Sequence, residues 1–168
     1  MSPPSGSCMM IVVIVRKPMP YRPDIVASRP SGELILVVEV KSRLGTGEDW
    51  ARVLRRNLLA HGGAPSPQFF LLALPDRFYL WTKESQALPD APPDHVIDPR
   101  EMLSPYLSRS AGLKGLSGQS FELVIASLLQ ELASGEAPEG PPAAYSRLRE
   151  SGLVPALKDT RLAYEAAA

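Results

Sequence analysis

The strand candidate from Glu33 to Lys41 constrains the fold of this chain more than any other stretch. Its sequence, ELILVVEVK, is apolar at nearly every position between charged ends. The even-numbered face is wholly apolar, and the odd-numbered face is apolar in the middle only. A strand that is apolar on both faces is covered on both sides by other elements. The sequence therefore predicts a central strand, with Glu39 and Lys41 at its carboxyl end.

A second strand, Asp24 to Ala27, precedes this one, and Arg29-Pro-Ser-Gly32 between them is turn chemistry. A two-residue loop at Ser31-Gly32, or a four-residue loop from Pro30 to Glu33, pairs the strands in the same register. Either loop places Asp24 opposite Glu39, with their Cβ atoms about 5 Å apart. A slip of one residue would move Asp24 to the other face.

The remaining pattern predicts an α/β domain. An amphipathic helix is expected over Glu48 to Ala60, with Thr46 or Gly47 as its cap and His61 at its end. A buried strand from Gln68 to Leu74 follows, so the strand–helix–strand order predicts a right-handed crossover and a parallel pair. Further strands are predicted at Phe78–Trp81 and His95–Ile97, and further helices at Pro99–Ser110 and Ser117–Ala133.

Composition bounds the function only weakly. The 18 basic and 18 acidic residues cancel, so nucleic acid or an acidic membrane would have to meet a local basic patch. Cys8 is the only cysteine, which excludes an intrachain disulfide. The apolar run Met9 to Val15 is too short to span a membrane, and a cytoplasmic location is expected. We expect residues 1–20 to be a flexible or atypical arm, 21–133 the domain, and 134–168 an Ala/Pro-rich tail with at most a short helix at Ala144–Glu150.

Three residues near the hairpin suggest metal chemistry. Mg²⁺ prefers oxygen ligands and usually accepts only one or two carboxylates, which Asp24 and Glu39 could supply. The backbone carbonyl of Val40 is a candidate third ligand. Lys41 projects from the same face as Glu39, so its ammonium group could orient a metal-bound water and stabilise charge on a phosphoryl group. The predicted reaction is phosphodiester hydrolysis with Mg²⁺, and Mn²⁺ is a possible substitute.

Pro23-Asp24, followed by Glu39-Val40-Lys41 at the end of an apolar strand and then by a basic helix and a buried strand, resembles the PD-(D/E)xK nuclease superfamily. The resemblance covers about residues 21–81. It implies a restriction-endonuclease-like mixed sheet (β-hairpin, crossover helix, parallel strand) flanked by helices, in a DNA endonuclease. Asp24 and Glu39 would then be metal ligands and Lys41 the catalytic lysine. Asn57 is the available counterpart of an auxiliary polar group on the second helix.

Alternatives remain open at this stage. The candidate phosphate contacts are Arg43, Arg52, Arg55 and Arg56, although a solvated helix face explains the helical arginines equally well. The chain has no acidic residue before Asp24, where the family often carries one. It could therefore be a catalytically lapsed module that binds nucleic acid or a protein, or an α/β protein whose Glu39 and Lys41 form a surface ion pair. A homodimer through the helix Ser117–Ala133 is also possible.

Overall fold

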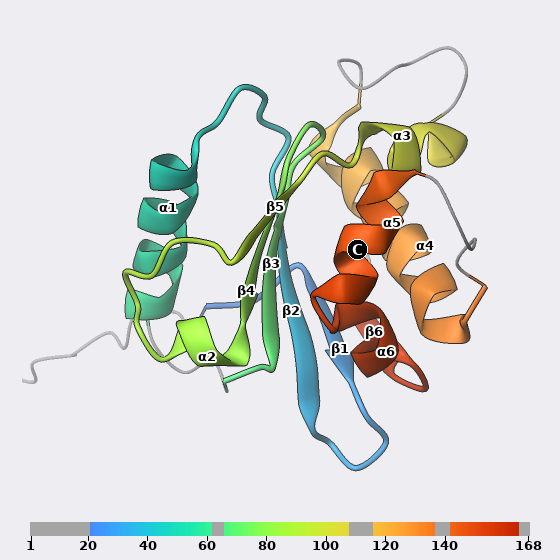
Figure 1. Cartoon of the computed structure of the whole chain (residues 1–168), viewed down its shortest axis with the longest axis horizontal. Coiled ribbons are helices and arrows are strands. Elements are labelled where there is room, and N and C mark those ends of the chain that lie inside the picture. Colours follow the sequence, from blue (N-terminus) through green and yellow to red (C-terminus); the bar gives the residue numbers. More distant parts are fainter. Residues whose placement is uncertain (1–20, 62–65, 108–115, 137–141, 165–168) are drawn as a thin grey trace, which may run out of the picture.

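The computed structural model describes residues 21–61, 66–107, 116–136 and 142–164, which form three layers (Figure 1). A six-stranded sheet lies in the middle. Helices α1 (Glu48–Ala60) and α2 (Lys83–Gln86) lie on one side of it. On the other side lie α3 (Arg100–Leu103), the 3₁₀ turn η1 (Ser104–Tyr106), α4 (Gly118–Ser134), α5 (Ala143–Glu150) and α6 (Leu153–Leu157).

The sheet is mixed, with the order β5-β4-β3-β2-β1-β6. Its strands are β1 (Ile25–Ser28), β2 (Leu34–Val40), β3 (Phe69–Ala73), β4 (Phe78–Thr82), β5 (His95–Ile97) and β6 (Arg161–Tyr164). Strands β2 and β3 are parallel and joined through α1, and the other neighbours are antiparallel. The predicted α/β class, the parallel pair and the helix flanking are confirmed.

Strand β2 contributes to two apolar cores, one on each face of the sheet. Val38 and Val40 belong to the larger core, shared with α4, α5 and α6. Val37 belongs to the smaller core under α1, together with Phe70 and Trp81. The prediction that this strand is central and covered on both faces is confirmed.

The β1–β2 hairpin reaches the predicted pairing by a different turn. Arg29 N–H donates to the Glu33 carbonyl at 2.9 Å, and Gly32 N–H to the Arg29 carbonyl at 2.8 Å, which leaves a three-residue loop. Gly32 has a φ of +90°, a conformation that favours glycine. A bulge in β2 compensates for the odd loop length, because Ser28 pairs with Leu34 whereas Ala27 pairs with Leu36.

The bulge also corrects the predicted faces of β2. Leu34 packs against the core under α1, and Ile35 belongs to the core under α4, the reverse of strict alternation with the rest of the strand. From Leu36 onward the alternation holds as predicted. An extra residue resets the period of two, and the sequence contains no local signal for it.

Two predictions at the C-terminal end need correction. The helix expected over Pro99–Ser110 ends early: α3 stops at Leu103 and a 3₁₀ turn follows, because Pro105 has no backbone N–H to continue the helical hydrogen bonds. The described residues of the stretch 134–168 do not form a tail. They are 134–136, at the end of α4, and 142–164, which include α5, as foreseen, but also α6 and β6, which pairs with β1. The predicted arm, residues 1–20, lies outside the described residues.

Candidate active site at the carboxyl end of strand β2

The end of β2 gathers the three predicted residues and one that was not predicted. Ile25 pairs with Val38, so the next position of the hairpin sets Asp24 opposite Glu39, as expected from the sequence. Glu39 lies on the face covered by α1, because its partner on β3 is Leu72, a member of the core under that helix. Lys41 follows on the same face.

Glu39 is a buried carboxylate with a donor on each oxygen. Its residue is only 5% exposed. Oε1 accepts from the Lys41 ammonium at 2.5 Å, and Oε2 accepts from the Tyr21 hydroxyl at 2.8 Å. A buried charge is tolerated when it is paired and hydrogen-bonded, and both conditions are met here. The Lys41 side chain remains 40% exposed, so its ammonium group faces solvent as well as Glu39.

The Asp24 carboxylate accepts a hydrogen bond from the backbone of β2 rather than from a side chain. Its Oδ2 accepts from the Val40 N–H at 2.7 Å, and the next N–H, that of Lys41, donates to the Ala73 carbonyl on β3 at 3.0 Å. The Asp24 carboxylate is therefore fixed against the β2 backbone at the residue after Glu39. Val40 enters the site through its N–H; the ligand role of its carbonyl oxygen stays a prediction.

Tyr21 is the residue that sequence reasoning missed. The pKa of its hydroxyl is raised far above the ordinary value, by burial first and then by the charge of Glu39, the hydrogen bond to Glu39 and the charge of Asp24. The hydroxyl therefore stays protonated and donates to Glu39. Tyr21 lies in a proline-rich stretch that resembles a linker, and no periodicity marks a contact with a residue 18 positions later.

The donor chemistry of the pair fits a hard divalent cation. Asp24 and Glu39 offer carboxylate oxygens from facing positions, and Mg²⁺ is commonly held by one or two carboxylates with water and substrate oxygens completing its shell. Within the described ranges, no group of three or more His, Cys, Asp and Glu side chains is arranged to hold a metal. The candidate is thus a two-carboxylate site with a lysine beside it.

Arg43 remains close to this site along the chain. It is exposed, and its guanidinium carbon lies 5.2 Å from the ring centroid of Trp50 on α1. Trp50 is half-buried and packs against the core under α1, which agrees with a core role. Arg43 is therefore a stacked, solvent-facing cation two residues beyond Lys41.

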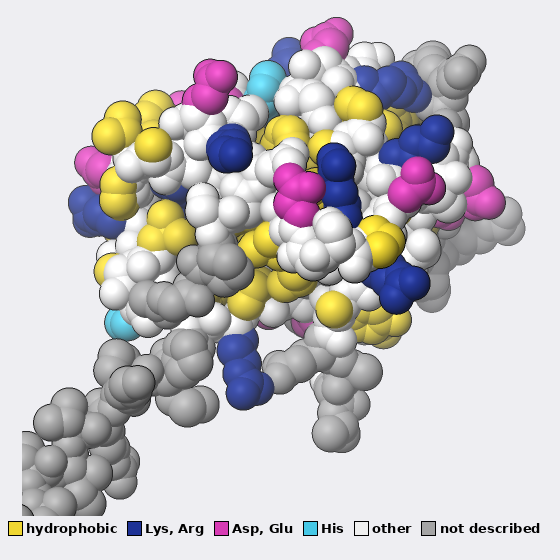
Figure 2. Space-filling view, turned by 90° about the horizontal axis from the view of Figure 1, so that it is seen from below, with side chains coloured by type: hydrophobic (Ala, Val, Ile, Leu, Met, Phe, Trp, Pro, Cys, Tyr) yellow, Lys and Arg dark blue, Asp and Glu magenta, His cyan; other side chains and the backbone are white. Residues whose placement is uncertain are grey.

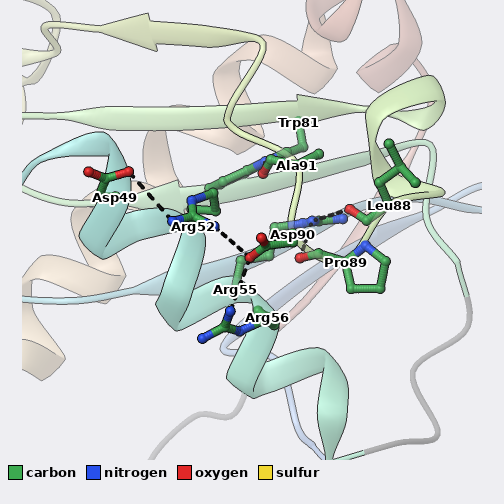
Figure 3. Close-up of polar contacts among 9 residues, drawn as sticks. All are labelled: Asp49, Arg52, Arg55, Arg56, Trp81, Leu88, Pro89, Asp90 and Ala91. Carbon is green, nitrogen blue, oxygen red and sulfur yellow. Dashed lines mark hydrogen bonds and ion pairs between the residues drawn. The ribbon is translucent and has the colours of Figure 1, made fainter.

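Arg55 does not fit its predicted role as a phosphate contact (Figure 3). It is 1% exposed, and its guanidinium donates to the carbonyls of Leu88 and Pro89 at 3.2 Å each and of Gln86 at 3.4 Å. Its Cζ also lies 5.2 Å from the ring centroid of Trp81. A guanidinium enclosed in this way cannot contact a phosphate, so the prediction for Arg55 is wrong.

Arg52 and Arg56 face the same loop rather than the end of β2. Both Nη1 atoms contact Oδ1 of Asp90, at 2.7 Å and 3.2 Å, and Arg52 also contacts Asp49 at 3.6 Å (Figure 3). Asn57 is exposed on α1. Arg52 and Arg56 are therefore engaged by Asp90 rather than by Glu39. Their contacts with nucleic acid and the auxiliary role of Asn57 stay predictions.

The surface elsewhere carries charges of both signs. Viewed from the end of the molecule that holds the β1–β2 turn, basic and acidic side chains are interspersed (Figure 2). This agrees with a net charge of zero. A polyanion would meet no field of a single sign on this face.

Comparisons of the chain with models of known families, with curated proteins and with solved structures gave no match. Across the described parts of the chain, no helix has the length and apolar content needed to cross a membrane. The candidate site is therefore interpreted from its own geometry.

Proposed function

We propose that this chain is a Mg²⁺-dependent endonuclease that hydrolyses DNA phosphodiester bonds, with a restriction-endonuclease-like version of the mixed sheet as its scaffold. One observation carries the proposal: at the carboxyl end of a central strand, the Asp24 carboxylate accepts from the Val40 N–H at 2.7 Å and the Lys41 ammonium lies 2.5 Å from Glu39. The order of hairpin, crossover helix and parallel strand around this site supports the same assignment, which is that of the PD-(D/E)xK superfamily.

Each residue then has a separate role. A divalent cation, when bound, supplies Lewis acidity that makes water a better nucleophile and polarises the phosphate. Asp24 and Glu39 hold that cation, with the Val40 carbonyl as a further oxygen donor. Lys41, which is only partly covered, contacts a phosphate oxygen and stabilises charge that develops on it. Arg43 contacts the DNA backbone and helps to set its position.

One observation favours a second function. Both oxygens of Glu39 already hold donors, Tyr21 and Lys41, and the α1 arginines are engaged by the loop around Asp90. Such a closed arrangement suits a catalytically lapsed module that binds nucleic acid or a protein partner through another surface. The two functions differ in whether divalent cations matter.

Cleavage of supercoiled plasmid DNA with Mg²⁺ or Mn²⁺ tests the proposal. We expect Asp24→Ala and Lys41→Ala to lower the rate by about 100-fold or more, since each removes a group that acts on the transition state. Lys158→Ala, which removes an exposed lysine just after α6 on the other side of the sheet, is the matched control and should retain most activity. Equal residual cleavage in wild type, Asp24→Ala and Lys41→Ala would show contamination.

DNA binding separates the second function from the first. Binding that weakens steeply with salt, without cation-dependent cleavage, would support the lapsed module. Neither binding nor cleavage would exclude both functions. A homodimer, which would allow both strands to be cut, can be checked in the same preparation by sedimentation and stays a prediction.

A further inference from the structure

The hydroxyl of Tyr21 lies at the centre of the candidate site. It donates to Oε2 of Glu39 at 2.8 Å, while Lys41 occupies Oε1. The Tyr21 ring packs against the apolar core under α1. Packing against this core therefore restricts the Tyr21 ring, and the restricted ring keeps the hydroxyl within hydrogen-bond distance of the Glu39 carboxylate.

The two donors on Glu39 differ in rigidity. Lys41 has a long, flexible side chain that is 40% exposed, whereas an aromatic ring packed in a core has little rotational freedom. The orientation of the Glu39 carboxylate is thus set mainly by Tyr21. Lys41 can leave Oε1 for a substrate phosphate without releasing the carboxylate.

The segment that carries Tyr21 is fastened to β2 at two successive residues. Tyr21 binds the side chain of Glu39, and Asp24 binds the N–H of Val40 at 2.7 Å. The same four-residue stretch thus delivers one proposed ligand, Asp24, and orients the other. Hydrogen bonds to ligating carboxylates commonly tune metal affinity by about 10–100-fold.

We propose that Tyr21 is a positioning residue for divalent-cation binding: its hydroxyl holds Glu39 in the orientation in which that carboxylate and Asp24 bind one cation. The inference rests on the proposed metal site and adds a residue to it. Tyr21 itself need not contact the cation or the DNA.

Binding of Mn²⁺ to the full chain without DNA, followed by electron paramagnetic resonance, tests this role apart from catalysis. Tyr21→Phe keeps the packed ring and removes only the hydroxyl. We expect its dissociation constant for Mn²⁺ to rise by about 10-fold or more. Tyr106→Phe is the matched control, because it removes a similar hydrogen bond, to Glu131, in the layer on the other side of the sheet, and should leave Mn²⁺ affinity unchanged.

A double-mutant cycle shows whether Tyr21 acts through Glu39. In a Glu39→Gln background the Tyr21→Phe change should have little further effect on Mn²⁺ affinity, since coupled residues are not additive. Full additivity would overturn the proposal. Amide exchange at Val40 supplies a second readout: loss of affinity with unchanged protection supports positioning, whereas loss of both identifies a merely structural role and overturns it.

The outcomes for the two proposals are distinguishable. If wild type binds Mn²⁺ and Tyr21→Phe binds it equally well, the role of Tyr21 is refuted and the nuclease proposal stands. If wild type binds no Mn²⁺, the metal site itself is refuted, and the role of Tyr21 with it.

Discussion

Glu39 and Arg55 are both buried and charged, but they have different kinds of partner. Glu39 is paired with the Lys41 ammonium, accepts from the Tyr21 hydroxyl and lies at the end of a strand. Arg55 meets main-chain carbonyls and aromatic rings in place of a carboxylate, and its Nε has no hydrogen-bond partner. The partners of Glu39 are compatible with the proposed metal site. Arg55 instead joins α1 to the loop that contains Leu88 and Pro89.

The role of Arg55 as a fastener predicts a large loss of stability on truncation. Arg55→Ala should lower the free energy of unfolding by about 2–4 kcal/mol, because it leaves buried carbonyls without donors and a gap beside Trp81. Urea denaturation measures this. Arg56→Ala, which removes only an exposed ion pair with Asp90, should change it by less than about 1 kcal/mol. Comparable losses in both variants would contradict this role.

At the scale of elements, Asp94 connects the end of β4 with α2 and the start of β5. One oxygen, Oδ2, accepts from the Thr82 N–H at 2.7 Å, from the Thr82 hydroxyl at 3.1 Å and from the Ser85 hydroxyl. Burial raises the pKa of this carboxyl, but the hydrogen bonds from Ser85 and Thr82 and the charge of His95 outweigh it. The net pKa lies below the ordinary 3.8.

Because the pKa of Asp94 is lowered in the folded state, the stabilisation that Asp94 provides depends on pH in a known direction. The stabilisation by Asp94 is fully present above the ordinary pKa of 3.8 and is lost as pH falls through the lower folded value. Asp94→Asn should therefore be less stable than wild type at pH 7, and the difference in urea denaturation should shrink below about pH 3.8. A constant difference down to pH 2 would be evidence against this account.

At the scale of the whole molecule, the C-terminal stretch completes the fold. Ala144, Tyr145, Leu148, Leu153 and Leu157 are buried in the core with α4, and β6 covers the outer side of β1. Strand β1 follows directly on Asp24, so the last described strand supports the strand that presents the candidate site. Burial of each such side chain contributes about 1.5–3 kcal/mol, so the summed contribution of several is comparable with the free energy of unfolding of a typical domain.

Truncation tests the contribution of this stretch to the whole fold. A chain ending at Glu136 should lose its cooperative thermal transition by circular dichroism, because the apolar face of α4 loses its cover. A chain ending at Tyr164, which keeps every described element, should unfold like the full chain. If the shorter chain also unfolds cooperatively at the same temperature, residues 142–164 are dispensable for folding.

Local sequence patterns determined much of this protein. The doubly apolar run of β2 predicted a central strand, and the helical periodicities placed α1 and α4 within a residue of their observed bounds. The register of β1 and β2, in which Ile25 pairs with Val38, also followed from hairpin geometry, although an odd loop and a bulge produced it together. These features are predictable because alternation and periodicity record which face of an element is buried.

Tertiary structure alone decided which partners the polar groups found. Tyr21 meets Glu39, and Arg55 meets the carbonyls of Gln86, Leu88 and Pro89, across separations of 18 to 34 residues. Strand β6 pairs with β1 from the opposite end of the chain. Periodicity shows that a face is buried but not what covers it, since the cover is set by how distant elements pack. The sequence by itself thus determined where the carboxylates lie, and packing decided which groups hold them.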